Sequence, residues 1–90
     1  MTYLWDETKN RTNLRDHGFD FFDAEKVFGG PMLIEEDSCQ TYGEKRMLGI
    51  GFLEGRVVVI IYSEPANETT RIISMRKANN HEKDRFIKTI

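Results

Sequence analysis

Residues that form disulfide bonds or bind metal ions are scarce in this sequence. Among its 90 residues there is one cysteine, Cys39, which cannot form an internal disulfide, so we expect a reduced, cytoplasmic protein. The two histidines, His17 and His81, lie far apart, and neither a CxxC nor an HxxxH spacing occurs. These absences argue against a disulfide scaffold and a zinc site, and we expect no metal and no other cofactor.

Long apolar runs are absent as well. The longest one, residues 57–62, has six residues, whereas a membrane-spanning helix needs roughly 20. The start of the chain lacks the basic residues and the apolar stretch of a secretory signal. We therefore expect a single domain over residues 1–90 and no membrane partner.

The net charge of −2 is small but unevenly distributed. Residues 1–37 contain four Lys or Arg and nine Asp or Glu, which gives −5, whereas residues 38–90 contain nine and six, which gives +3. The overall balance argues against direct DNA binding. The C-terminal part could hold an anion, or its cations could pair with the acidic N-terminal part, and charge alone leaves both open.

Helix signals fill the first third of the chain. Asp6 is placed to cap a helix that runs to about His17, after which a glycine follows. Asp20 is placed to cap a second helix through Phe28, which the following Gly-Gly-Pro ends. A short edge strand is expected before both, at residues 3–5.

Strand signals dominate the remainder. Runs at residues 44–53 and 56–64 flank Glu54-Gly55, a two-residue turn that predicts a β-hairpin. The other predicted elements are strands at 32–36 and 70–77, a loop at 37–43, and a closing helix that begins at Asn79 or Asn80 with Phe86, Ile87 and Ile90 on its apolar side. The pattern predicts an α+β fold: a small antiparallel sheet with N-terminal helices and a C-terminal helix.

The hairpin turn determines which side chains share a face of the sheet. One face is expected to form the main core beneath the helices, with Leu48, Ile50, Phe52, Val57, Val59 and Ile61. The opposite face contains two glycines, among Met47, Gly49, Gly51, Arg56, Val58, Ile60 and Tyr62. Glycines in strands indicate that a helix or a ligand backbone approaches closely, and the sequence does not decide which.

The first helix is unusually polar on one face, which would present Asn10, Asn13, Leu14 and His17. The two amides could form buried hydrogen bonds that hold the following loop. Alternatively, His17 could line a site together with Lys9 and Asn13. Both interpretations stay open.

The strand at 70–77 combines apolar residues with cations. If Ile73 and Met75 enter the core, Arg76 lies on the glycine face beside Tyr62, whose ring could then stack on a base. Arginine binds phosphate oxygens well. The cations of this strand could instead pair with acidic residues of the first third, such as Asp6, Asp16 or Asp20.

Three segments of the chain, in order, carry a family pattern. Residues 5–21 read W-D-x-x-K-N-x-x-N-x-x-x-H-G-F-x-F. Residues 44–49 contain Glu44, Arg46 and Gly49, and residues 71–78 read R-I-I-S-M-R-K-A. Together they cover nearly the whole chain and resemble the BrnT family of bacterial toxins. Asp16 stands where the family usually has a basic residue, and Met75 replaces its usual alanine.

The resemblance implies a fold similar to RelE-type toxins and metal-independent endoribonuclease activity on messenger RNA. It also implies a hetero-oligomer with a BrnA-like antitoxin of the ribbon-helix-helix class, encoded nearby, which would cover the toxin and supply the DNA binding. The alternative is a non-catalytic interaction domain that binds an antitoxin or another partner peptide.

Cleavage of this kind uses the 2′-hydroxyl of RNA as the nucleophile, and it needs a proton acceptor, charge stabilisation at the phosphate and a proton donor. The candidate catalytic residues are His17, Glu44, Arg71 and Arg76. The candidate substrate-binding residues are Lys9, Asn13, Arg46, Tyr62 and Lys77. Acid and base stay open among His17, Glu44 and Lys9. The hypothesis requires the strand end at Arg76-Lys77 and the helix end at His17 to form one cationic pocket.

Overall fold

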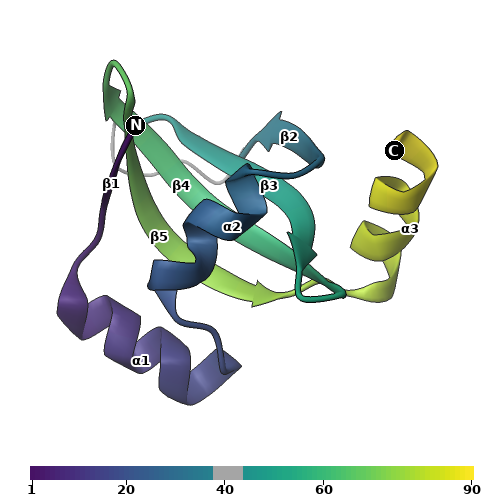
Figure 1. Ribbon diagram of the computed structural model, residues 1–90, viewed down its shortest axis with the longest axis horizontal. Coiled ribbons are helices and arrows are strands. Elements are labelled where there is room, and N and C mark those ends of the chain that lie inside the picture. The colour runs from purple at the N-terminus through teal and green to yellow at the C-terminus, as the bar shows by residue number, and fades with distance from the viewer. Residues whose placement is uncertain (38–43) are drawn as a thin grey trace.

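The computed structural model describes residues 1–37 and 44–90, and these form the predicted α+β fold around one five-stranded sheet (Figure 1). The strands are β1 (Thr2–Leu4), β2 (Met32–Glu36), β3 (Arg46–Leu53), β4 (Arg56–Ala66) and β5 (Thr69–Lys77), arranged in the order β1-β5-β4-β3-β2. The helices are α1 (Glu7–His17), the short 3-10 helix η1 (Phe21–Asp23), α2 (Ala24–Phe28) and α3 (Asn80–Thr89). Most of the predicted loop at 37–43, including Cys39, lies outside the described residues.

The capping residues determine where the helices begin and end. The Asp6 carboxylate accepts hydrogen bonds from the backbone N–H groups of Thr8 and Lys9, at 2.8 and 3.1 Å, and therefore begins α1. Gly18 ends α1 in the left-handed conformation, with φ 78°. Asn79, one of the two predicted caps, is the N-cap of α3. The second predicted helix starts as η1 and becomes α2.

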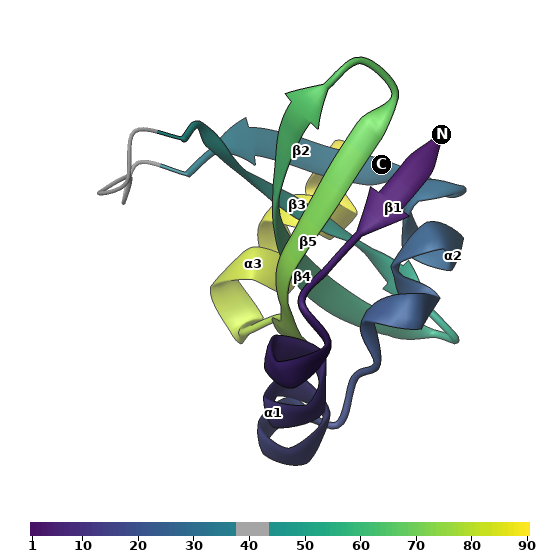
Figure 2. The ribbon, with the colours of Figure 1, turned by 90° about the vertical axis from the view of Figure 1, so that its left-hand side faces the viewer.

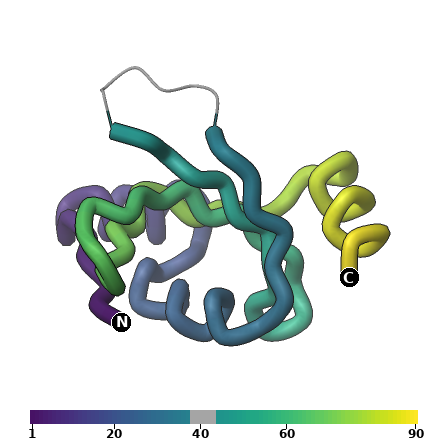
Figure 3. The backbone as a smooth tube through the Cα atoms, turned by 90° about the horizontal axis from the view of Figure 1, so that it is seen from above, coloured from purple at the N-terminus to yellow at the C-terminus, as the bar shows by residue number. Residues whose placement is uncertain are grey.

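The helices lie on different sides of the sheet. α2 lies over one face and α3 over part of the other, whereas α1 runs beside β5 (Figure 2). Seen from above, α1 and α3 lie at the two ends of the sheet (Figure 3). Between these two helices, part of the sheet face that carries α3 has no described helix over it.

One edge of the sheet is parallel, which the prediction of an antiparallel sheet missed. β1 pairs with β5 in parallel, from Thr2 opposite Thr69 to Leu4 opposite Arg71. All other strand pairs are antiparallel. The chain can make this parallel edge because α1, α2 and the hairpin separate β1 from β5 in sequence.

The predicted hairpin register is confirmed, from Leu53 opposite Arg56 to Arg46 opposite Ser63. Glu54 and Gly55 form the turn with φ of 51° and 81°, as expected for a two-residue hairpin.

The assignment of the main core to one face of this hairpin was wrong. The glycine face carries the larger core, which contains Phe19, Phe21, Ala24, Val27, Leu53, Val58, Ile60, Tyr62, Ile72 and Met75. The other face carries a smaller cluster of Ile50, Val57, Val59, Ala78 and Phe86. The helices η1 and α2 supply more apolar surface than α3 does, because Ile87 and Ile90 of the C-terminal end stay more than half exposed.

The two strand glycines make room for α2 and β2, not for a ligand. A Cβ on Gly51 would lie 2.7 Å from Cγ1 of Val27 on α2, and one on Gly49 would lie 2.6 Å from Cε of Met32 on β2. The Met32 side chain can move, but the β-branched Val27 is stiff. Gly51 therefore sets how closely α2 packs on the sheet.

Gly51→Ala is expected to lower the free energy of unfolding by about 1–3 kcal/mol, because the added methyl group overpacks the contact with Val27. Gly30→Ala is the matched control. Its Cβ would meet only a carbonyl oxygen at 3.9 Å, so the control should be neutral or slightly stabilising. Urea denaturation of both variants measures the difference, and equal stabilities would contradict this packing.

A β-bulge in β5 overturns the predicted register of that strand. Met75 lies opposite Ile60 and Ile72 opposite Tyr62, so these two residues enter the main core and Ile73 is left unpaired between them. Arg76 lies opposite Val59 and therefore stands on the α3 face, not on the glycine face as predicted.

Candidate functional site

Two buried asparagines attach α1 to its neighbours. Nδ2 of Asn13 donates to the carbonyl oxygens of Phe19 and Met75 at 3.0 and 2.9 Å, and its Oδ1 accepts from the N–H of Met75 at 3.1 Å. Oδ1 of Asn10 accepts from the N–H of Phe21 at 2.8 Å. The structural interpretation of these amides is therefore confirmed. The predicted role of Asn13 in substrate binding does not fit, because its polar atoms bind the protein backbone.

Two adjoining hollows lie along α1 and β5, and Lys9 and Ile73 line both of them. The first, of about 270 Å³, is also lined by His17 and Asp16. The second, of about 340 Å³, is also lined by Arg71. Lys9 therefore connects the helix end that carries His17 with the strand that carries Arg71, so three of the predicted residues lie along one groove.

The sheet face between α1 and α3 carries a row of polar residues. The register places Arg46, Ser63 and Arg71 side by side on β3, β4 and β5. Ser74 lies in the next row of the same face. We call these four residues the open face, within which Ser63 itself is fully buried. Within residues 1–37 and 44–90, α3 is the helix on this side, and its buried Phe86 packs on a different part of the face, with Ile50, Val57 and Val59.

Glu44 organises the open face. Its Oε1 accepts from Oγ of Ser63 at 2.9 Å and from Nη1 of Arg71 at 2.8 Å. The Arg71 side chain is still 45% exposed. Because a guanidinium group has five N–H donors, this contact orients Arg71 while leaving donors for an anion.

Arg76 is held by α3. Its Nη1 and Nη2 donate to the two carboxylate oxygens of Glu82, both at 2.8 Å. The same carboxylate accepts from the N–H of Asn79, which completes the capping box of α3. The predicted pocket of Arg76 with His17 is therefore not formed, since Arg76 faces α3 and His17 lines the groove on α1.

The Arg76 pair makes acid stability depend on Glu82. The hydrogen bonds from Arg76 hold the pKa of Glu82 below its ordinary value, and the N–H of Asn79 lowers it further. A lowered pKa in the folded state stabilises the fold above the unfolded-state pKa, and this contribution is lost as the pH falls through the folded-state value. Glu35, paired with Arg85, acts with the same sign.

In Glu82→Gln the charge is absent at every pH, so we expect its deficit in unfolding free energy relative to the original chain to be largest at neutral pH. The deficit should shrink as the pH falls below about 4.3, the ordinary glutamate value. Urea denaturation between pH 7 and pH 3 measures this. A deficit that stays constant over that range would contradict the role of the charge.

Two further predicted residues lie elsewhere. Tyr62 is only 4% exposed and packs edge-on against Phe28 with ring centroids 5.0 Å apart, so its predicted role as a stacking platform was wrong. Burial also raises its pKa. Lys77 lies opposite Val58, on the face away from Arg76. It lines a hollow near the hairpin turn.

The alternative, in which the cations of this strand pair with acidic residues of the first third, does not hold for the described pairs. Arg71 binds Glu44 and Arg76 binds Glu82, both from the C-terminal part of the chain. Sequence reasoning missed Glu82, although the Asn79-x-x-Glu82 spacing of a capping box was visible. Ser63 carried no sequence signal, because its position beside Arg71 depends on the bulge.

No helix among the described residues has the length and apolar character needed to cross a bilayer. In the same part of the chain, no three side chains from His, Cys, Asp or Glu gather where they could hold a metal ion.

The fold is similar to that of a ribonuclease toxin. The structure matches the crystal structure of the Brucella abortus ribonuclease toxin BrnT with a TM-score of 0.65 and 28% sequence identity, over 89% of this chain and 100% of that chain. Residues 5–82 match the family described as the ribonuclease toxin BrnT of type II toxin-antitoxin systems. A search of the curated proteins gave no match. The chain belongs to the BrnT family of ribonuclease toxins. The likeness to RelE-type toxins stays a prediction.

Proposed function

We propose that this chain is a toxin that cleaves messenger RNA without a metal ion, and that it binds the scissile phosphate on the open face beside Arg71. The observation that supports this site is the row of Arg46, Ser63 and Arg71 next to the groove that contains Lys9. Family membership supports the ribonuclease activity. The row supports this location, because an anion there would meet cations from two strands and from α1.

The reaction proposed is attack by the 2′-oxygen on the adjacent phosphorus. The bond from phosphorus to the 5′-oxygen breaks, which leaves a 2′,3′-cyclic phosphate and a 5′-hydroxyl end. The 2′-hydroxyl proton passes to a base and the 5′-oxygen receives a proton from an acid. The phosphorane between these steps carries extra negative charge, and cations already held in place stabilise it most effectively.

The roles follow from position. Arg71 and Arg46 are proposed to bind the phosphorane, with Arg76 adding charge from beside α3. Glu44 lies on Arg71 and is proposed as the base, and this contact would also align Arg71 with the reacting phosphate. His17 and Lys9, which line the groove, are the candidates for the acid that protonates the leaving oxygen.

We further propose that the antitoxin is a BrnA-like ribbon-helix-helix protein that forms a hetero-oligomer with this chain. Family membership in a type II system implies an antitoxin partner. The net charge of −2 supports DNA contact through that partner and not through this chain.

Induced expression with and without the neighbouring gene tests the proposal. Growth arrest with loss of messenger RNA, rescued by the partner, is the expected result. Harmless expression combined with tight partner binding would instead establish the non-catalytic interaction domain. With the purified protein, cleavage should persist in excess EDTA, and a loss restored by a divalent ion would overturn metal independence.

A further inference from the structure

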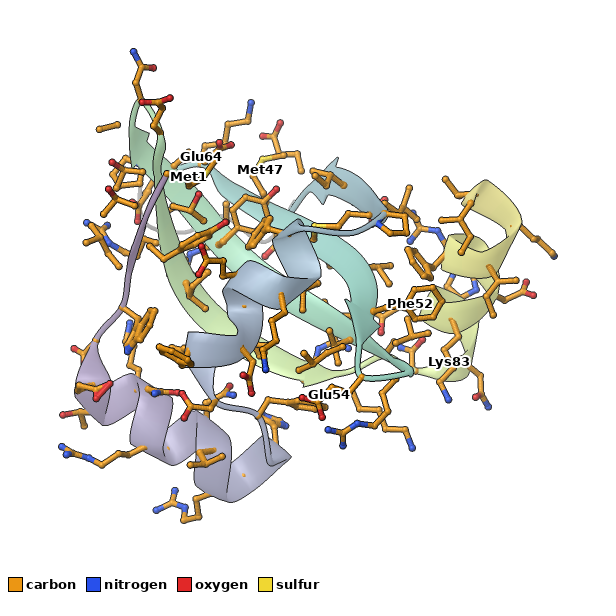
Figure 4. The ribbon with its side chains drawn as sticks, in the orientation of Figure 1. Met1, Met47, Phe52, Glu54, Glu64 and Lys83 are labelled. Carbon is orange, nitrogen blue, oxygen red and sulfur yellow. The ribbon has the colours of Figure 1, made fainter. Side chains whose placement is uncertain are left out.

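A second cationic hollow lies at the hairpin-turn end of the sheet, away from the open face. It has a volume of about 400 Å³, and its lining includes Phe52, Arg56, Lys77, Lys83 and Ile87. We call these five residues the turn patch. Figure 4 shows Phe52 and Lys83 close to each other beside α3, with Glu54 at the turn below them.

The cations of the turn patch have no carboxylate partner among the described residues. Arg71, Arg76 and Arg85 each bind a glutamate, whereas Arg56, Lys77 and Lys83 form no ion pair in that part of the chain. The guanidinium group of Arg56 lies 4.8 Å from the ring centroid of Phe19. This cation–π contact does not neutralise the charge of Arg56. Neighbouring acids are already engaged, Glu54 with Lys26 and Asp84 with Lys88.

An aromatic ring lies among these cations. Phe52 is 38% exposed, and its ring meets that of Phe86 at 80° with centroids 4.9 Å apart. Phe86 is fully buried, so this contact fixes the orientation of Phe52. Ile87, 59% exposed, extends the apolar surface. A fixed, half-exposed ring surrounded by cations is the arrangement that binds single-stranded nucleic acid, through stacking and phosphate contacts.

We infer that the turn patch binds nucleotides of the RNA strand beyond the cleavage site, with a base on Phe52 and phosphates on Lys77 and Lys83. This inference rests on the proposed function and adds a substrate subsite to it. Lys77 lies at the end of β5 on the face opposite to Arg76, so a strand bound at the open face would pass beside α3 and around this end of the sheet to reach the turn patch.

Charge favours RNA over a protein partner here. An acidic peptide could also neutralise three cations, but it would have to match their positions with carboxylates. RNA offers a regularly spaced phosphate backbone together with bases for the exposed ring, and both kinds of group are present in the turn patch.

The test uses the full chain and a single-stranded RNA of about a dozen nucleotides that carries 2′-O-methyl groups and so cannot be cleaved. Binding is measured by fluorescence anisotropy at several salt concentrations. The double variant Lys77→Gln/Lys83→Gln should bind more weakly, and the slope of log K against log salt should become shallower by about 1.4. Phe52→Leu should weaken binding roughly 5-fold or more at constant slope.

The matched control is Lys26→Gln/Lys88→Gln, which removes the same charge from two exposed lysines that already bind carboxylates. It should change the slope little. Patch variants that bind like this control, or an original chain that does not bind the RNA, would overturn the inference. Patch variants that lose antitoxin binding while RNA binding persists would assign the patch to the protein partner and also overturn it.

The two proposals can fail separately. Patch-dependent binding by a chain that cleaves no unmodified RNA would refute the nuclease and keep the subsite. Cleavage by a chain whose patch variants bind RNA normally would keep the nuclease and remove the subsite.

Discussion

Asn13→Leu is expected to lower the free energy of unfolding by about 3–5 kcal/mol, a large part of the roughly 5–15 kcal/mol available to a domain of this size. Asn13 is 6% exposed and joins α1 to β5 through both backbone groups of Met75. Leucine has a similar volume but leaves these groups and the carbonyl of Phe19 without partners. Each unsatisfied buried group costs about 1–3 kcal/mol.

The size of this effect comes from the end of β1. β1 pairs with β5 only as far as Arg71, so among residues 1–37 and 44–90 no strand lies beside the remainder of that edge. The Asn13 amide provides the donor and acceptor that a strand would otherwise supply at Met75. Loss of the amide therefore opens a sheet edge, which is a greater change than loss of one surface contact.

Denaturation with urea, followed by circular dichroism, measures the change. Thr12→Ala, at an exposed position one residue away on the same helix, is the control and should stay within about 0.5 kcal/mol of the original chain. Asn13→Leu with less than about 1 kcal/mol of destabilisation would mean that water replaces the amide at Met75.

The elements could be predicted from local chemistry because their ends depend on single residues. Backbone groups within a few positions are satisfied by the caps Asp6 and Asn79 and by the Glu54-Gly55 turn. The effect of these residues can therefore be predicted from the local sequence. The face that carries the main core could not be read in this way. It depends on which helices cross the sheet, and Val27 against Gly51 is a contact between distant segments.

The candidate site was predicted in part for the same reason. Lys9 and His17 lie on one helix, so helical spacing places them along one groove. Arg76 was misplaced because the bulge at Ile73 shifts every later residue of β5 to the opposite face. No local signal predicts that bulge. Tyr62 was assigned to a ligand for another reason: it lies on the glycine face as predicted, but that face carries the main core.

Arg71→Ala is expected to reduce kcat for RNA cleavage by about 10²–10³-fold, the usual loss when one donor to a developing oxyanion is removed. Fold stability should change little, because Arg71 and Glu44 form an exposed pair worth at most about 1 kcal/mol. Arg71→Lys should recover part of the activity, since it keeps the charge but not the planar fork of donors.

Single-turnover cleavage of a short RNA, with circular dichroism as the check on folding, measures these variants. Arg11→Ala removes the same type of charge from an exposed position on α1, outside both the groove and the open face, and should retain nearly full activity. If Arg71→Ala cleaves as fast as Arg11→Ala, the phosphate does not bind beside Glu44. In that case the groove around Lys9 and His17 would have to hold the reaction without the sheet, and the row of Arg46, Ser63 and Arg71 would lose its proposed purpose.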